Sequence, residues 1–145
     1  MARLMGIDYG TKRIGLAIGD DDGTPASPIK MLQASGRVDD DVRAVLACAQ
    51  EYAVDALVVG LPLNMDDTEG PQAKLTRVFG ERLTRETGLT VHYRDERLST
   101  FAAGQLLQPA ALSRKKRKTR LDSISAQVIL QDFLDARAAQ RDGDR

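Results

Sequence analysis

Residues 4–19 read LMGIDYGTKRIGLAIG and predict the beginning of a β-sheet. Two apolar runs are separated by the turn sequence GTK, and in the second run Ile14, Leu16 and Ile18 alternate with other residues. A period of two residues is typical of a strand, and a short connection of this kind joins antiparallel neighbours. Asp8 interrupts the first run with a carboxylate. The stretch therefore predicts a β-hairpin that carries an acid inside an apolar strand.

The sequence that follows predicts a mixed sheet. Turn residues at 20–23 and a short strand around residues 29–32 would complete an antiparallel meander of three strands. Further strands are expected at Ala56–Val59 and Val91–Tyr93, and helices from Val38, from Pro71 to Gly88, from Ser99 or Thr100 to Leu107, and from Leu121 onward. This order predicts an α/β fold with a five-stranded mixed sheet flanked by helices. We expect residues 1–137 to form a single domain and residues 138–145 to fray.

The composition excludes several classes of protein. A single cysteine, Cys48, excludes an internal disulfide, and its place beside a helical apolar stripe predicts inert packing. The apolar stretches are much shorter than the roughly 20 residues of a membrane span, and no signal-like apolar region follows Met1. These features predict a cytoplasmic protein.

Positive charge is concentrated in one segment. The chain has 21 basic and 21 acidic residues, yet residues 114–120 read RKKRKTR, with six basic residues and no acid, so the rest of the chain carries a net charge of −6. Such a segment predicts contact with the phosphates of a nucleic acid, and the alternative is a solvated loop. We expect it to be a mobile arm that precedes the last helix.

Asp8 is also the first candidate for chemistry, because a carboxylate in an apolar strand is costly unless its charge is compensated. An ion pair with Lys12 or Arg13 is one explanation. The other is a metal site, since hard cations such as Mg²⁺ are bound by carboxylate oxygens.

Two further acidic positions could join Asp8. The pair Asp95 and Glu96 follows a predicted strand, where open sheets place ligand-binding groups, and Asp122 lies at the expected start of the last helix. A capping role is the alternative for Asp122. Two carboxylates about 4 Å apart repel by about 4 kcal/mol at an effective dielectric of 20, so three would converge only around a cation. Mg²⁺ or Mn²⁺ would satisfy them.

Other polar residues are weaker candidates. His92, the only histidine, is expected to be a strand side chain turned to solvent or to a helix face rather than a general base. Arg94 and Arg97 flank the acidic pair and would either contact phosphate or form ion pairs with those acids.

Four strings carry a resemblance to a known family: GIDYGTKRIGLAIGD, VVGLPLNMDDTEGPQA, DERLST and KKRKTRLDSISAQVILQDFLD. In this order they closely resemble the YqgF/RuvX family, to which Holliday junction resolution and pre-16S rRNA cleavage have been assigned. The resemblance implies an RNase H-like fold and a metal-dependent nuclease. It also implies an acidic triad of Asp8, Glu96 and Asp122, with Asp95 as the alternative middle acid.

The resemblance guides the remaining expectations. The residues expected to bind nucleic acid are Lys12, Arg13, Arg97, Arg114, Lys115, Lys116, Arg117, Lys118 and Arg120. Structured precursor rRNA is favoured as substrate over branched DNA, and the protein would act as a monomer or a homodimer. The sequence departs from the family pattern at Asp67, where Gly is usual, at Gly19 in place of Ser and at Ser125 in place of Ala.

Two other functions compete with the nuclease. The string GIDYGT also resembles the phosphate-binding hairpin of the actin, sugar kinase and Hsp70 superfamily, but that architecture needs two such domains to enclose a nucleotide. A protein that binds precursor rRNA without cutting it would use the basic segment alone. Metal-dependent cleavage separates these functions from the nuclease.

Overall fold

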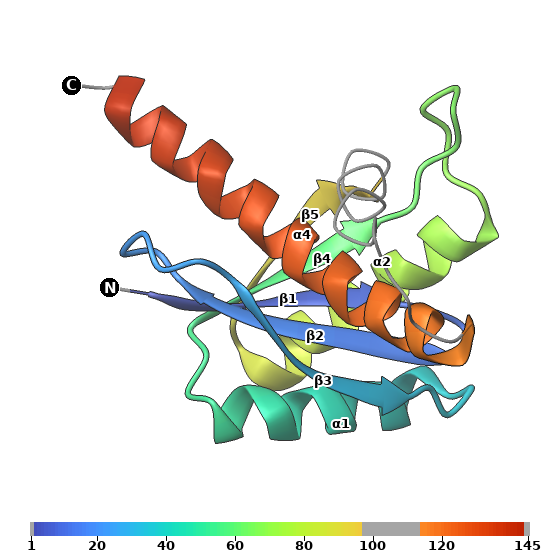
Figure 1. The fold of residues 1–145 in the computed structure, drawn as a ribbon. Helices are drawn as coiled ribbons and strands as arrows, with labels where there is room; N and C mark the ends of the chain where they lie inside the picture. The colour runs from blue at the N-terminus through green and yellow to red at the C-terminus, as the bar shows by residue number, and fades with distance from the viewer. Residues whose placement is uncertain (1, 97–113, 144–145) are drawn as a thin grey trace.

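The computed structural model describes residues 2–96 and 114–143, with side chains described for residues 2–96 and 124–141. Five strands form one mixed sheet in the order β3-β2-β1-β4-β5 (Figure 1). The strands are β1 (Arg3–Tyr9), β2 (Arg13–Asp20), β3 (Ser27–Gln33), β4 (Ala56–Leu61) and β5 (Thr90–Asp95). The described helices are α1 (Val38–Glu51), α2 (Pro71–Thr87) and α4 (Arg114–Gly143). The predicted α/β fold with a five-stranded mixed sheet is confirmed.

The first three strands form the predicted antiparallel meander. The β1–β2 turn is closed by a hydrogen bond from the backbone N–H of Gly10 to the carbonyl oxygen of Arg13, at 2.9 Å. β3 is longer than the expected 29–32 and includes Pro28, which an edge strand accommodates because one of its sides forms no ladder. β1, β4 and β5 then run parallel to one another, so their carboxyl ends lie at the same edge of the sheet.

Helices cover both faces of the sheet, which explains why Ala56–Val59 is apolar throughout rather than alternating. On one face, α1 and α2 pack on the odd-numbered residues of β1. The buried residues there include Met5, Ile7, Tyr9, Val42, Val45, Phe79 and Leu83. On the other face, the described helix that crosses the sheet is α4 (Figure 1). The buried core there contains Leu4, Ala17 and Val58 of the sheet and Ala126, Ile129, Leu130 and Leu134 of α4.

The last helix begins earlier and ends later than expected. The basic segment 114–120 forms the first turns of α4, so the prediction of a mobile arm is wrong. The physical reason is local: lysine and arginine are good helix formers, and neither glycine nor proline occurs between Arg114 and Asp142. Residues 138–143 continue the helix rather than fraying, and the Arg141 guanidinium donates a hydrogen bond to the carbonyl oxygen of Asp21.

The structure bears differently on the expected short helix and on the expected absence of a membrane span. The short helix expected from Ser99 or Thr100 to Leu107 lies outside the described residues. Within the described part of the chain, no helix combines the length and the apolar character that a membrane span requires, α4 included.

Candidate active site

The carboxyl edge of the parallel strands gathers two of the predicted acids. Asp8 is the penultimate residue of β1, Asp95 is the last residue of β5, and Glu96 follows directly. β4 lies between these two strands. Open sheets bind ligands just beyond the carboxyl ends of their parallel strands, so this edge is where a site is expected.

The strand alternation places Asp8 on the α4 face of the sheet. Leu4 belongs to the core under α4, and a Cβ built on Gly6 would lie 2.6 Å from the carbonyl oxygen of Ala126. Successive residues of a strand point to opposite faces, so Asp8 shares the face of Leu4 and Gly6. Its side chain is half-buried.

The same argument separates Glu96 from Asp95. His92 packs its ring on Phe133 of α4, with 4.8 Å between centroids, and Arg94 pairs with Asp132 of α4. The even-numbered residues of β5 therefore face α4, whereas Asp95 falls on the opposite face.

Gly60 gives a second observation on Glu96. A Cβ built on Gly60 would lie 3.6 Å from the Cγ of Glu96 and 2.5 Å from Cδ1 of Ile129. Because Ile7 pairs with Val59, Gly60 is also the next position of β4 beside Asp8. Asp8 and Glu96 thus lie on one face, on either side of a glycine that leaves room between their strands. The geometry favours Glu96 over Asp95 as the partner of Asp8.

The position of residue 122 follows from how α4 crosses the sheet. Gly19, which pairs with Leu4, meets Leu134 and Leu130; two residues further along β1, Gly6 meets Leu130 and Ala126. Each step of two strand residues, about 6.6 Å, corresponds to one step of four helix residues, about 6 Å. A further step of the same size would lead from Asp8 to position 122, four residues before Ala126.

Asp122 lies within α4 and not at its start. It lies eight residues after Arg114, so the expectation that it starts the last helix is wrong, and it is too far from the helix start to cap it. Its side chain is outside the described set. Among the side chains that are described, no group of three or more His, Cys, Asp or Glu residues is placed to hold a metal ion. The triad of Asp8, Glu96 and Asp122 thus stays a prediction.

The residues predicted to bind nucleic acid lie in part at this edge. Lys12 is exposed in the β1–β2 turn, and Arg13 is half-buried at the start of β2. The backbone of residues 114–120 forms the first turns of α4, whereas Arg97 lies outside the described residues. By the same stepwise correspondence, these first turns extend past Asp8 toward the carboxyl edge.

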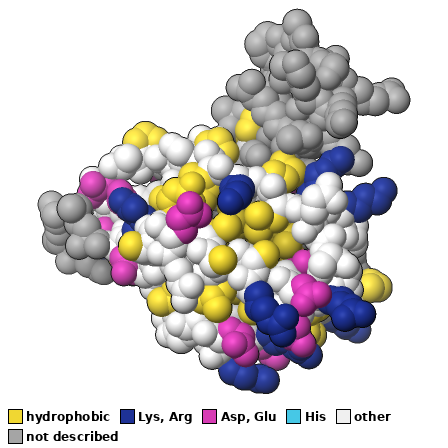
Figure 2. Space-filling model, turned by 90° about the horizontal axis from the view of Figure 1, so that it is seen from below, with side chains coloured by type: hydrophobic (Ala, Val, Ile, Leu, Met, Phe, Trp, Pro, Cys, Tyr) yellow, Lys and Arg dark blue, Asp and Glu magenta, His cyan; other side chains and the backbone are white. Residues whose placement is uncertain are grey.

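Among the described residues, the face covered by α1 and α2 has no comparable concentration of positive charge. A cavity of about 320 Å³ between α1 and α2 is lined by Asp39, Val42, Arg43, Arg82, Arg85 and Glu86. On the face shown in Figure 2, basic side chains lie among acidic ones. A mixed surface of this kind does not attract phosphate strongly.

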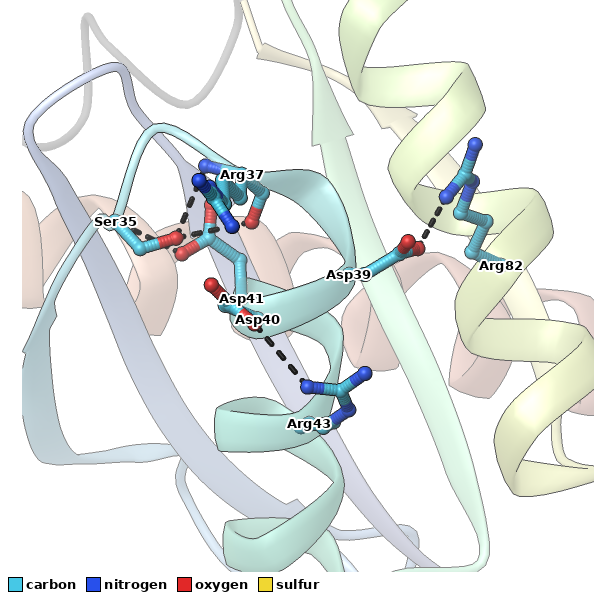
Figure 3. A network of polar contacts seen from close by, with 7 residues as sticks. All are labelled: Ser35, Arg37, Asp39, Asp40, Asp41, Arg43 and Arg82. Carbon is cyan, nitrogen blue, oxygen red and sulfur yellow. Dashed lines mark hydrogen bonds and ion pairs between the residues drawn. The ribbon is translucent and has the colours of Figure 1, made fainter.

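Sequence reasoning missed a buried network behind Asp8. Asp41 is 2% exposed and accepts hydrogen bonds from the Tyr9 hydroxyl at 2.9 Å and from the backbone N–H of Ser35 at 2.8 Å. Figure 3 shows Asp41 beside Ser35, while the neighbouring Asp39 reaches Arg82 of α2. The signal was available, since Asp41 lies at helical spacing from the apolar Val38 and Val45 and so on the buried side of α1.

Tyr9 connects this network to the edge. Its ring stacks on Phe79 with 3.9 Å between centroids, and its carbonyl oxygen accepts a hydrogen bond from Gln72 Nε2 at 2.9 Å. Burial raises the pKa of the Tyr9 phenol above its usual range, and the hydrogen bond to Asp41 adds to the increase. These contacts hold the residue that follows Asp8 from two sides.

The contacts of His92, Cys48 and Arg94 explain these three other candidates as structural residues. Burial under α4 lowers the pKa of His92, and the positive charge of Arg137 lowers it further, so the expected helix-face position is confirmed. Cys48 is buried in the core, and burial raises the pKa of its thiol, as expected of inert packing. Arg94 pairs with Asp132 at 2.6 Å, a partner that differs from both expectations from the sequence, phosphate contact and ion pairing with the adjacent acids.

The loop after β4 contains the departure at Asp67. Asp67 adopts a φ of 70°, so a residue with a side chain occupies a left-handed position that usually favours glycine. The Thr68 backbone N–H and hydroxyl both donate to Asp66 Oδ1, and Glu69 pairs with Arg77 at 2.6 Å. The hydrogen bond from Arg77 holds the pKa of Glu69 below its ordinary value.

Solved structures share this fold. Over 96% of this chain and 97% of the other, the fold matches Thermus thermophilus RuvC in complex with a Holliday junction substrate, with a TM-score of 0.62 and 15% identity. A ROK family protein from Streptococcus pneumoniae matches with a TM-score of 0.52 and 15% identity, but only 39% of that protein is covered. The first match supports the RNase H-like fold, whereas the second protein shares the fold over only part of its own length.

Sequence relatives narrow the assignment. A protein of Moorella thermoacetica named "Putative pre-16S rRNA nuclease" is 44% identical over 92% of this chain and 94% of its own length. A protein of the same name from Symbiobacterium thermophilum is 44% identical over 95% of both chains. The family model RuvX, described as Holliday junction resolvase, matches residues 2–136. The chain therefore belongs to the RuvX family of nucleases.

Proposed function

We propose that this protein is a divalent-metal-dependent endonuclease that cuts the precursor of 16S rRNA near its 5′ end, in the cytoplasm. Asp8, Glu96 and Asp122 would hold Mg²⁺ or Mn²⁺. The observation that supports the proposal best is the common face of Asp8 and Glu96 at the carboxyl edge, on either side of Gly60.

The donor chemistry fits the metal. Carboxylate oxygens are the preferred ligands of Mg²⁺ and Mn²⁺, and the glycine at position 60 leaves no side chain between Asp8 and Glu96. A bound divalent cation would polarise the phosphodiester and stabilise the charge that develops on it.

The other residues of the edge would bind and orient the substrate. Lys12, Arg13 and the basic first turns of α4 would contact phosphates on either side of the acids, with Arg97 beside Glu96. His92 is an unsuitable general base, because its ring is packed against Phe133. In metal-assisted hydrolysis, water would supply the attacking oxygen, so no protein nucleophile is required.

RNA is the proposed substrate because the relatives with 44% identity carry a pre-16S rRNA name. The description of the family model and the RuvC complex favour a second candidate, resolution of four-way DNA junctions. Phosphate contacts do not distinguish the two polymers, because discrimination depends on contacts to the 2′-hydroxyl.

The test compares both substrates directly. End-labelled precursor 16S rRNA and a labelled four-way DNA junction would be incubated with the protein and Mn²⁺ or Mg²⁺, with and without chelator, and with the Asp8→Asn variant as control. We expect metal-dependent cleavage of the RNA at a defined site and none by the variant. Cleavage of the junction alone would make branched DNA, and not precursor rRNA, the substrate. RNA binding without cleavage of either substrate would contradict the assignment as an enzyme.

A further inference from the structure

Helix α4 is attached to the sheet by a small set of polar contacts. Ala26, between β2 and β3, is bound twice: Gln127 Nε2 donates to its carbonyl oxygen at 2.9 Å, and its N–H donates to Gln131 Oε1 at 2.8 Å. At the opposite edge of the sheet, Arg94 Nε of β5 donates to Asp132 Oδ2 at 2.6 Å. The helix is thus bound through polar groups at both sides of the sheet.

The apolar packing beneath α4 is close. Ala126, Ile129 and Leu130 fit tightly over Gly6 and Gly60, in a core that also contains Leu4, Ala17 and Val58. The polar contacts add directional restraint to this packing, because the strength of a hydrogen bond depends on its distance and its angle. They therefore help to fix α4 along its own axis.

The Arg94–Asp132 pair is placed where axial position would affect chemistry. Arg94 lies two residues before Glu96 on the same face of β5, and Asp132 is on the helix that carries Asp122. A single ion pair thus joins two of the three elements that supply the acids. Both side chains are about one-third exposed, so the contact is not an ordinary surface pair.

We propose that Arg94 and Asp132 are positioning residues that fix α4 along its axis and so set the distance between Asp122 and the pair Asp8 and Glu96. This inference rests on the proposed metal site. A displacement of about 1 Å in catalytic geometry can cost about 100-fold in rate, so removal of the pair lowers metal affinity and turnover although neither residue contacts metal or substrate.

The test is a double-variant cycle with Arg94→Met, Asp132→Asn and the combination. Each single variant is expected to weaken Mn²⁺ affinity by about 10- to 100-fold in calorimetry and to lower kcat by a similar factor, with KM for precursor rRNA unchanged. The double variant is expected to lose no more than the worse single variant, because both changes remove the same contact.

The matched control is Arg3→Met. Arg3 Nε pairs with Asp20 Oδ1 at 3.2 Å, a contact of the same type at the amino end of β1. This variant is expected to lose some resistance to urea and to keep the parental Mn²⁺ affinity. An equal loss of affinity in Arg3→Met would mean that general destabilisation, not positioning, explains the effect, and would overturn the inference.

Other results would also overturn it. If Arg94→Met raises KM while Asp132→Asn has no effect, Arg94 contacts phosphate itself. If losses in the two single variants add in the double variant, the residues act separately. Parental Mn²⁺ affinity in all three variants overturns the inference alone, whereas a parental protein that binds no Mn²⁺ overturns the proposed function together with it.

Discussion

At the scale of single residues, the acid in β1 is held by its neighbour. Tyr9 directs its ring into the core opposite to Asp8 and is bound at both its hydroxyl and its carbonyl, by Asp41 and Gln72. These contacts restrict the movement of the end of β1, and therefore also of Asp8, which directly precedes Tyr9. A metal ligand is most effective when surrounding contacts lock its position.

The first prediction concerns the Tyr9 hydroxyl. Tyr9→Phe removes one of the two hydrogen bonds to the buried Asp41 carboxylate, so we expect the free energy of unfolding in urea to fall by about 1 to 3 kcal/mol. Tyr52→Phe is the matched control, because the Tyr52 hydroxyl has no hydrogen bond with the described residues. A Tyr9→Phe protein as stable as Tyr52→Phe would show that the Tyr9–Asp41 bond contributes nothing to stability.

Residue-level reasoning from the sequence reached Asp8 but left Asp95 and Glu96 open. Their side chains differ by one position at a strand end, and only the register of β5 against β4 and its contacts with α4 decide which acid shares the face of Asp8. The burial of Asp41 was also missed, although its helical spacing from Val38 and Val45 indicates the buried side of α1.

At the scale of elements, α4 is the part that sequence reasoning described least well. The period of Ile124, Val128 and their neighbours predicted a helix, but a segment with six basic residues carries no apolar repeat to extend it. Helix propensity alone continues the element to Arg114. The strands were easier to predict, because their apolar runs end at turn residues.

The second prediction tests the contact between β5 and α4 through His92. Burial against Phe133 lowers the pKa of His92 below its ordinary value of 6.5, and the Arg137 charge lowers it further. As the pH falls, the imidazole of His92 is protonated first in the unfolded chain, because its pKa is higher there. The contribution of His92 to the free energy of unfolding is therefore complete above pH 6.5 and is lost as the pH falls through the lower pKa of the folded protein.

The measurement is an NMR titration of the only imidazole in the chain. We expect a midpoint below 6.5 in the native protein, a rise in Phe133→Ala, and a smaller rise in Arg137→Gln. The order follows from burial being the larger cause. A native midpoint at or above 6.5 would contradict the partial burial of His92 under α4.

At the scale of the whole molecule, charge is divided between two regions. A chain that is neutral overall places six basic residues in the first turns of α4, near the edge that carries Asp8, and leaves a net charge of −6 elsewhere. This separation orients a polyanion before any specific contact forms. The separation of charge could be predicted from the sequence, whereas the distance of the basic segment from the acids depends on how α4 crosses the sheet.

The third prediction concerns the basic segment. Replacing Lys115, Lys116 and Lys118 with Ala should weaken RNA binding about equally for many sequences, because phosphate contacts carry no direct base information. If all three lysines contact phosphate, the slope of log K against log salt should shrink by about 0.7 per contact on single-stranded RNA, about 2 in total.

Filter binding over a series of salt concentrations measures that slope. The control combines Lys30→Ala and Lys74→Ala, two exposed lysines of β3 and α2 away from α4, and should keep the parental slope. Mn²⁺ affinity should be parental in both proteins. A triple variant with the parental affinity and slope would show that the RNA lies elsewhere.

The claim on which the whole account depends is the metal site of Asp8, Glu96 and Asp122, and calorimetric titration with Mn²⁺ tests it most directly. Each change to the neutral isostere, Asp8→Asn, Glu96→Gln or Asp122→Asn, should abolish binding, because it deletes an anionic ligand of the same shape. Asp95→Asn, on the opposite face of β5, should bind Mn²⁺ like the parental protein. Parental affinity in the Asp8→Asn protein would contradict the site, and loss of binding in Asp95→Asn with retention in Glu96→Gln would move its middle ligand to Asp95.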